Sequence, residues 1–324
     1  MNDLTFLAPV EKKRCLVLGG TGFIGVNLVK KLLSLGYSVR LFTRFNLNRQ
    51  KFPDSEKLEI IVGDIQDENL IAKAVLGCEV CFHLISTVLP GSSNLDPVFD
   101  IESNLLFTVK LLNCLAKSKI EKIIFLSSGG TVYGQPTTLP IVEAHSTNPR
   151  CSYGIVKLAI EKYLSLYHQL YGLNYVVLRL SNPFGEYQSV KARQGAVAVF
   201  LGRALCGQPV EIWGDGSVVR DYVYISDVID AMIKAMHYSG PERLFNIGSG
   251  CGLSVDQVLD CIELVTQTAV ERCYSVSRSF DVPVNVLSIE RAKELLDWYP
   301  VVPFLVGLEN MVRWLSADLE VIDF

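Results

Sequence analysis

A glycine-rich turn near the start of the chain constrains its fold more than any other feature. The apolar segment Arg14–Leu18 leads into Gly19-Gly20-Thr21-Gly22-Phe23-Ile24-Gly25, and a helical pattern runs from about Phe23 to Leu35. Glycines at this spacing allow a tight turn, close approach of a pyrophosphate to the backbone, and close packing of the helix on the strand. The helix N-terminus then presents free N–H groups to the anion. The pattern predicts a dinucleotide-binding unit with contacts from Gly19, Gly22, Phe23, Ile24 and Gly25.

Short apolar runs alternate with helical patterns through the first half of the chain. Strands are expected at Arg14–Leu18, Ser38–Thr43, Glu59–Val62, Val80–Ile85, Lys122–Ser127 and Tyr175–Leu180, with helices around Ile101–Lys117 and Tyr153–Tyr171. This alternation predicts an α/β fold with a Rossmann-type, doubly wound parallel sheet.

The alternation of predicted strands and helices ends after Asn182, where Gly and Pro become frequent. Short strands are expected at Val210–Trp213, Tyr222–Ile225 and Phe245–Ile247, and helices near Val255–Val265 and Glu290–Leu296. We therefore expect a dinucleotide-binding domain over residues 1–182 plus a strand returning near 245–247. Residues 183–324 would mostly form a smaller C-terminal α/β domain that binds the substrate.

Composition and charge exclude several classes of protein. The net charge of −4 means that the chain has no excess of basic residues with which to bind nucleic acid. The sequence has no run of 18 apolar residues, so no membrane span is predicted. The start of the chain lacks a secretory signal pattern. Nine scattered cysteines suit a reducing cytoplasm, and Cys78 and Cys81 have no second pair with which to bind a metal. We expect a cytoplasmic protein.

The residue that selects the cofactor is ambiguous. An acidic residue usually ends the second strand of such a unit and bonds the ribose 2′-hydroxyl, but this chain has Thr43 and Arg44 there. Arg44 is expected to pair with a 2′-phosphate, which favours NADP, or to stack on adenine or face solvent, which leaves NAD. NAD is the first expectation and NADP stays open. Asp64 and Ile65 are expected near the adenine, and Leu84 and Ser86 at the end of the fourth strand, where the backbone faces the cofactor, whereas the adjacent His83 is interpreted as structural.

Tyr153 and Lys157 form a Tyr-x-x-x-Lys pattern at the start of a predicted helix. The spacing places both side chains on one helix face, about one turn apart. A phenol titrates near pH ~10, too high for a base at neutral pH. A neighbouring ammonium and a cationic nicotinamide favour the phenolate, so the pair is a candidate for proton transfer and for cofactor contact.

Taken together, the motifs resemble those of the extended short-chain dehydrogenase/reductase superfamily, and within it the nucleotide-sugar epimerase/dehydratase family. The resemblance covers nearly the whole chain. Its motifs are the glycine turn, His83-Leu84, Asn104, Ser127-Ser128-Gly129-Gly130-Thr131-Val132-Tyr133-Gly134, Tyr153 with Lys157, Arg179 to Gly185, Arg220-Asp221-Tyr222-Val223 and Asn246-Ile247-Gly248. It implies a nucleotide-sugar substrate, a cofactor contact by Asn104, and a homodimer built on the helices around 101–117 and 153–171.

Two departures from the family pattern bear on the reaction. Gly129 stands where the family's epimerases usually carry a serine that bonds the substrate O4. Thr131, and after it Ser128, are the candidates to replace that hydroxyl, and the alternative is a site that relies on Tyr153 alone. The Asp-Glu pair of the family's dehydratases is replaced by Gly130-Thr131, which leaves no carboxylates there for water elimination. The resemblance therefore implies a 4-epimerase similar to UDP-glucose 4-epimerase.

The resemblance also implies which residues grip the substrate. Asn182 and Arg220 would contact the diphosphate, Arg278 a phosphate, and Asp281 the nucleotide ribose. Asn285 matches a position where a bulky residue excludes N-acetylated sugars, so UDP-GlcNAc is expected beside UDP-glucose. The open alternatives are a 4,6-dehydratase with relocated carboxylates, an epimerase at another carbon, an NADPH-dependent 4-ketoreductase and a non-catalytic dinucleotide sensor.

Overall fold

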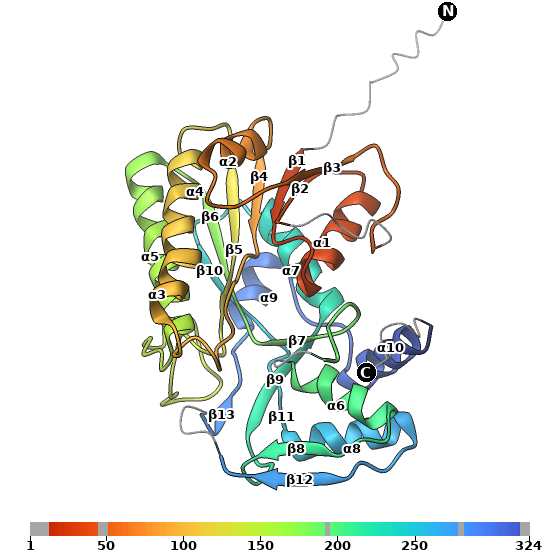
Figure 1. Ribbon diagram of the computed structural model, residues 1–324. Coiled ribbons are helices and arrows are strands. Elements are labelled where there is room, and N and C mark those ends of the chain that lie inside the picture. Colours follow the sequence, from red (N-terminus) through yellow and green to blue (C-terminus); the bar gives the residue numbers. More distant parts are fainter. Residues whose placement is uncertain (1–12, 45–50, 192–194, 278–281, 318–324) are drawn as a thin grey trace, which may run out of the picture.

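The main feature of the fold is a seven-stranded parallel sheet. The computed structural model describes residues 13–44, 51–191, 195–277 and 282–317 (Figure 1). The strands are β1 (Arg14–Leu18), β2 (Ser38–Thr43), β3 (Leu58–Val62), β4 (Val80–His83), β5 (Lys122–Ser128), β6 (Tyr175–Leu180) and β10 (Leu244–Ile247). Their order is β10-β6-β5-β4-β1-β2-β3, so the winding direction reverses between β1 and β4. Ligands of such sheets bind in the crevice at the carboxyl ends of the strands at that switch point.

Helices cover both faces of this sheet, which explains why its strands are almost continuously apolar. One face packs against α1 (Phe23–Ser34) and α7 (Ile225–His237), and the other against α2 (Glu68–Val75), α4 (Phe107–Leu115) and α5 (Ser152–Tyr171) (Figure 1). Beside β10 lies α9 (Glu290–Leu296). The Rossmann-type sheet and the returning strand near 245–247 are thus confirmed.

The remaining elements form a smaller layer below the carboxyl edge of the sheet in Figure 1. A small sheet contains β7 (Asn182–Phe184), β9 (Val219–Tyr224), β11 (Gly252–Ser254) and β13 (Val284–Asn285), and β8 (Val210–Trp213) pairs with β12 (Arg272–Ser275). Three helices, α6 (Ala196–Leu205), α8 (Val255–Thr266) and α10 (Phe304–Ala317), pack beside them.

Several boundaries differ from the sequence-based expectation. The helix expected over 101–117 is a short α3 (Pro97–Asp100), a π-helical segment η2 (Ile101–Leu106) and then α4. The fourth strand ends at His83, and the strand expected at Tyr222–Ile225 runs from Val219 to Tyr224. The helices α2, α6, α7 and α10 were not predicted. Since α7 packs on the main sheet, the chain returns to that sheet at residue 225, well before β10.

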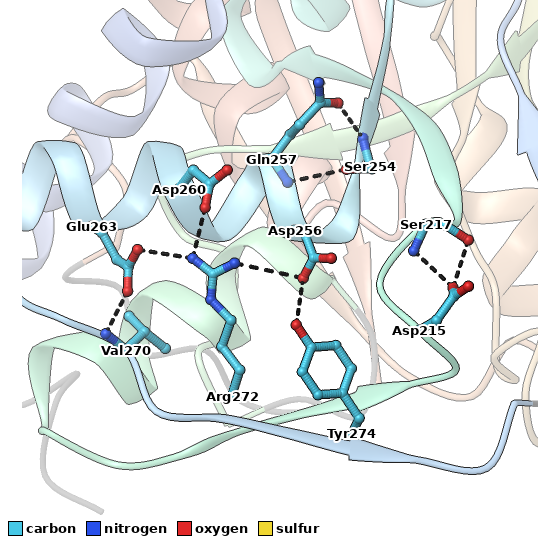
Figure 2. A network of polar contacts seen from close by, with 10 residues as sticks. All are labelled: Asp215, Ser217, Ser254, Asp256, Gln257, Asp260, Glu263, Val270, Arg272 and Tyr274. Carbon is cyan, nitrogen blue, oxygen red and sulfur yellow. Dashed lines mark hydrogen bonds and ion pairs between the residues drawn. The ribbon is translucent and has the colours of Figure 1, made fainter.

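A polar network fixes β12 to α8 in the smaller layer (Figure 2). The guanidinium of Arg272 bonds Asp260 at 2.7 Å and Glu263 at 2.8 Å, and lies 3.6 Å from Asp256. The three carboxylates share one face of α8, and the Tyr274 hydroxyl donates to Asp256 at 3.0 Å. One cation thus offsets repulsion among three carboxylates, which gives this network a structural role.

Candidate active site

The glycine turn has the geometry that a dinucleotide needs. Gly19 has φ +81°, and a Cβ there would stand 3.0 Å from the backbone of Leu84 at the end of β4. A Cβ on Gly25 would overlap the Gly19 carbonyl oxygen, so only glycine lets α1 approach β1 this closely. The first turn of α1 contains no acidic residue and Gly22 is exposed. The N–H groups of this helix end can therefore receive a pyrophosphate without competition from a carboxylate.

The residues expected at the adenosine end follow two neighbouring strands. Thr43 at the end of β2 pairs with Val62 of β3, and the exposed Arg44 and Asp64 follow these strands. The Asp64 carboxylate accepts from the Gln66 N–H at 2.9 Å, which closes the turn. Ile65 is buried in the core, so only its backbone and the turn around it face that edge. The structure therefore places an arginine, and no acidic side chain directly after β2, at this end of the crevice.

Tyr153 and Lys157 lie together on one face of α5. The Lys157 Nζ donates to the Leu126 carbonyl oxygen at 3.0 Å and lies 5.6 Å from the centre of the Tyr153 ring. Burial lowers the pKa of Lys157 to about 8, although Asp100 and Glu161 oppose that shift. Burial also raises the pKa of Tyr153 to about 12 in the protein alone. The tyrosine therefore needs further positive charge in the site before it can act as a base at neutral pH.

Two serine hydroxyls surround the Tyr153 hydroxyl. Ser86 and Ser128 act on Tyr153 and lower its pKa against the effect of burial. The Ser86 hydroxyl itself donates to the Val88 carbonyl oxygen at 3.1 Å. Ser86 was expected at the cofactor, and the structure also places it against the tyrosine.

Thr131 occupies a different position from Ser128. Its backbone lies against the start of α5, where a Cβ on Gly154 would stand 3.0 Å from the Thr131 carbonyl oxygen. The Thr131 hydroxyl is buried and has no hydrogen-bond partner among the described residues. Ser128 thus lies close enough to Tyr153 to lower its pKa, whereas Thr131 is not among the groups that act on the tyrosine.

Gly129 faces the segment that carries Asn285. The Asn285 Nδ2 donates to the Gly129 carbonyl oxygen at 3.2 Å, and a Cβ on Gly129 would stand 2.5 Å from the Leu287 Cδ1. Asn285 is completely buried, and its Oδ1 has no partner among the described residues. No local sequence pattern indicates this contact between the residue after β5 and the last residue of β13.

Two of the residues expected to contact the diphosphate form hydrogen bonds to backbone carbonyl oxygens of the protein. Asn182 donates to the Asp221 carbonyl oxygen at 3.0 Å from the start of β7. The Arg220 guanidinium donates to the Val282 carbonyl oxygen at 2.7 Å. Arg278 and Asp281 lie outside the described residues.

Two buried carboxylates behind the site, Glu161 and Asp221, were given no individual role in the sequence analysis. The carboxylate of Glu161, one turn after Lys157, receives Arg179 at 2.6 and 3.1 Å and the Ser127 hydroxyl at 2.5 Å. Asp221 accepts from the backbone N–H of Ser249 at 2.6 Å, among other donors. These contacts join segments far apart in sequence, which is why no local pattern indicates them.

Two polar side chains near the end of β4, His83 on that strand and Asn104 on η2, are buried. Nε2 of His83 lies 2.8 Å from the Thr108 hydroxyl, and burial lowers the pKa of His83 to about 3. This neutral, buried imidazole agrees with a structural role. Asn104 bonds the Thr87 N–H at 3.0 Å and is buried among side chains of its own segment. Asn104 therefore supports the loop beyond β4.

Other kinds of site find no support in the described part of the chain. No group of three His, Cys, Asp or Glu side chains there could hold a metal ion, and the nine cysteines are free thiols. No described helix is long and apolar enough to cross a membrane. A hollow of about 630 Å³ between α1, α7 and residues 53–55 contains none of the expected site residues.

Comparison with known proteins agrees with this geometry. Residues 15–248 match the family model described as NAD dependent epimerase/dehydratase family. The chain belongs to this family. Among its members, UDP-glucose 4-epimerase of Mycolicibacterium smegmatis is 34% identical over 306 residues, which cover 93% of this chain and 98% of that protein. The dTDP-4-dehydro-6-deoxyglucose reductase of Escherichia coli is 30% identical over 323 residues, which cover 94% of this chain and 98% of that protein.

Solved structures of family members have the same fold. UDP-glucose 4-epimerase of Thermotoga maritima with UDP-glucose gives a TM-score of 0.89 at 34% identity, covering 94% of this chain and 99% of that one. UDP-glucose 4-epimerase of Thermus thermophilus with NAD gives a TM-score of 0.86 at 32% identity, with the same coverage. The family and the fold are therefore established for this chain, and the description of the family names NAD.

Proposed function

We propose that this chain is a nucleotide-sugar 4-epimerase that interconverts UDP-glucose and UDP-galactose. One observation carries the proposal: Tyr153 and Lys157 lie on one helix face, with the Lys157 Nζ 5.6 Å from the centre of the Tyr153 ring and bonded to Leu126 of β5, at the crevice beside the glycine turn. Family members named UDP-glucose 4-epimerase support the same reaction. The absence of carboxylates at Gly130 and Thr131 supports epimerisation over dehydration.

The residues present fit NAD. The positive φ of Gly19 and the closeness of Gly25 to the turn form a cradle that a side chain would fill. Gly19, Gly22, Phe23, Ile24 and Gly25 would hold the pyrophosphate, Asp64 and Ile65 would lie by the adenine, and Leu84, Ser86, Tyr153 and Lys157 by the nicotinamide end. When bound, NAD supplies a reversible hydride acceptor and a positive charge beside Tyr153.

The chain's own groups then move the proton and hold the sugar. Lys157 supplies a second positive charge that favours the Tyr153 phenolate over the phenol. Tyr153 takes the proton of the sugar 4-hydroxyl when C4 is oxidised and returns it to O4 when the ketone is reduced. We assign to Ser128, rather than Thr131, the hydroxyl that bonds O4, because Ser128 acts on the pKa of Tyr153 and Thr131 does not.

Binding of the nucleotide is assigned to the smaller layer. Asn182, Arg220 and Arg278 would contact the diphosphate, and Asp281 the ribose. Asn285 is turned toward Gly129 and is smaller than the residue that excludes N-acetyl groups, so UDP-GlcNAc is proposed as a second substrate. We propose that residues up to about 182, together with residues 225–247, form the dinucleotide-binding part. Most of the remaining chain would then bind the nucleotide sugar.

We propose that the protein is a homodimer. Exposed apolar side chains gather on α3, η2 and α5, which pack side by side. They include Val98 (63% exposed), Ile101 (46%), Ile155 (56%), Leu166 (41%) and Leu170 (60%). A face of this kind is typical of a subunit interface. Light scattering would show a dimer for the wild type and a monomer for a Leu166→Glu/Leu170→Glu variant.

The nine free cysteines support a cytoplasmic location.

A second candidate is an NADPH-dependent 4-ketoreductase, favoured by the exposed Arg44 after β2 and by the related Escherichia coli reductase. One assay separates the two. The purified protein with UDP-glucose and no added reductant should produce UDP-galactose, and a Tyr153→Phe variant should not. A reductase would give no product until NADPH and a 4-keto sugar nucleotide were added.

A further inference from the structure

Asp100 is a buried carboxylate close to the catalytic pair that the proposed mechanism does not use. It lies at the end of α3 and is only 1% exposed. Its Oδ2 accepts from the Ser152 hydroxyl at 2.8 Å, and its Oδ1 accepts from the Asn104 Nδ2 at 3.0 Å. Burying a carboxylate is costly, so such a group calls for an explanation.

The two partners of Asp100 belong to the segments that position Tyr153. Ser152 is the first residue of α5 and directly precedes the tyrosine. Asn104 bonds both the N–H of Thr87 at 3.0 Å and its hydroxyl at 2.7 Å, and Thr87 follows Ser86. Asp100 therefore links the helix that carries Tyr153 to the loop that carries Ser86, a residue that acts on the pKa of Tyr153.

The charge of Asp100 has no cation of its own. Among the described residues it forms no ion pair within 4 Å, whereas Glu161, the other carboxylate near Lys157, receives two hydrogen bonds from Arg179. The field of Asp100 consequently falls on the Tyr153–Lys157 pair, in surroundings where charges are weakly screened.

The other ionisable groups facing the pair can be named. His83 at the end of β4 is neutral, since burial lowers its pKa to about 3. Cys151, just before α5, acts with Asp100 to raise the pKa of Tyr153 beyond the effect of burial. Asp100, ahead of Glu161, opposes the lowering of the pKa of Lys157 by burial. Asp100 is thus the carboxylate without a cation in contact whose charge acts on both members of the pair.

We propose that Asp100 is a positioning residue whose negative charge sets the pH range in which the Tyr153–Lys157 pair works. It stabilises the ammonium form of Lys157 and disfavours the Tyr153 phenolate. The acidic and the basic limb of the pH profile therefore both lie at higher pH than they would without this charge. The proposal rests on the proposed function for the use of the pair, but its two charge effects can be measured without turnover.

The test compares three variants. Asp100→Asn keeps the shape and removes the charge, Asp100→Glu keeps the charge, and Ser152→Ala removes one hydrogen bond and leaves the charge. In Asp100→Asn, both limbs of the pH profile of kcat/KM should move to lower pH by about one unit. In Asp100→Glu and Ser152→Ala the rate should fall while both limbs stay in place. A purely structural role for Asp100 would lower the rate in all three and move neither limb, which would overturn the proposal.

A second readout does not require turnover. The phenolate absorbance of the NAD-bound protein without sugar, minus that of the same protein with Tyr153→Phe, gives the ionisation of Tyr153 alone. Its midpoint should be about one unit lower in Asp100→Asn than in the wild type. An unchanged midpoint would refute the proposal. If Asp100→Asn does not fold, Asp100→Ser removes the charge with a smaller side chain and answers the same question. Failure of the wild type to convert any sugar nucleotide would refute the proposed function, and this titration would still decide the role of Asp100.

Discussion

Leu287 fills the space in which a side chain on Gly129 would stand, since a Cβ there would lie 2.5 Å from the Leu287 Cδ1. The leucine cannot easily withdraw. Its N–H donates to the buried Asp221 carboxylate at 3.2 Å, and its side chain packs with Val132 and Ile141 in a small apolar cluster. Gly129 and Leu287 therefore form a matched pair, which explains why this chain departs from the family's serine.

Gly129→Ser should destabilise the protein by about 1–3 kcal/mol, because the new side chain overlaps Leu287. Urea unfolding would measure the loss. In a Leu287→Ala background, which itself costs about 2–5 kcal/mol, the added serine should cost much less. Equal costs in the two backgrounds would show that Leu287 does not occupy this space.

Ser128→Ala should lower kcat by about 100-fold, the effect typical of losing one hydrogen-bond donor to reacting oxygen. Thr131→Val is the matched control, because the buried Thr131 hydroxyl has no hydrogen-bond partner among the described residues. That variant should keep near wild-type turnover and stability. A large loss in Thr131→Val together with a small loss in Ser128→Ala would reverse the assignment of the O4 partner.

His83 should make the protein less stable in acid. Its pKa is about 3 in the folded protein and near 6.5 when unfolded, so below pH 6.5 the unfolded state binds a proton that the native state does not. Stability should therefore fall as the pH drops from about 6.5 toward 3, by up to about 1.4 kcal/mol per pH unit from this group. Urea unfolding between pH 7 and 4.5 should show a shallower pH dependence for His83→Asn than for the wild type. Parallel curves would contradict the assignment.

Glu161→Gln should cost about 3–5 kcal/mol, because it leaves the buried Arg179 guanidinium without its counter-charge. Replacing both residues, in Glu161→Leu/Arg179→Met, should cost less than the single change, since no buried charge is then left alone. Thermal unfolding of the three proteins makes the comparison. A free energy of unfolding of Glu161→Gln within about 0.5 kcal/mol of the wild-type value would indicate that water reaches the Glu161–Arg179 pair.

Much of the main sheet could be predicted because its strands are apolar runs whose ends coincide with turn residues. The bounds of β1, β2 and β6 were predicted as observed. Two of the missed helices lack such signals. α7 begins directly where β9 ends, with no side-chain cap, so it has no clear start. α6 is apolar on most of its surface, so it has no clear polar face.

The site was predictable only where its residues are close in sequence. The spacing of Tyr153 and Lys157 on one helix face and the glycine turn each lie within one local motif. Asp100 and Ser152 are 52 positions apart, and Asn285 and Gly129 are 156 apart. Their contacts depend on how the layers pack, which no local pattern encodes.

The most direct test of the central claim follows the hydrogen at C4 of the sugar. UDP-[4-²H]glucose would be incubated with the purified protein in ordinary water without added reductant, and the products followed by NMR. We predict UDP-galactose that keeps its deuterium at C4, because the hydrogen leaves and returns within one bound complex, and no conversion by Tyr153→Phe. A 4-keto-6-deoxy product, or no conversion by the wild type of either this substrate or UDP-GlcNAc, would contradict the assignment as a 4-epimerase.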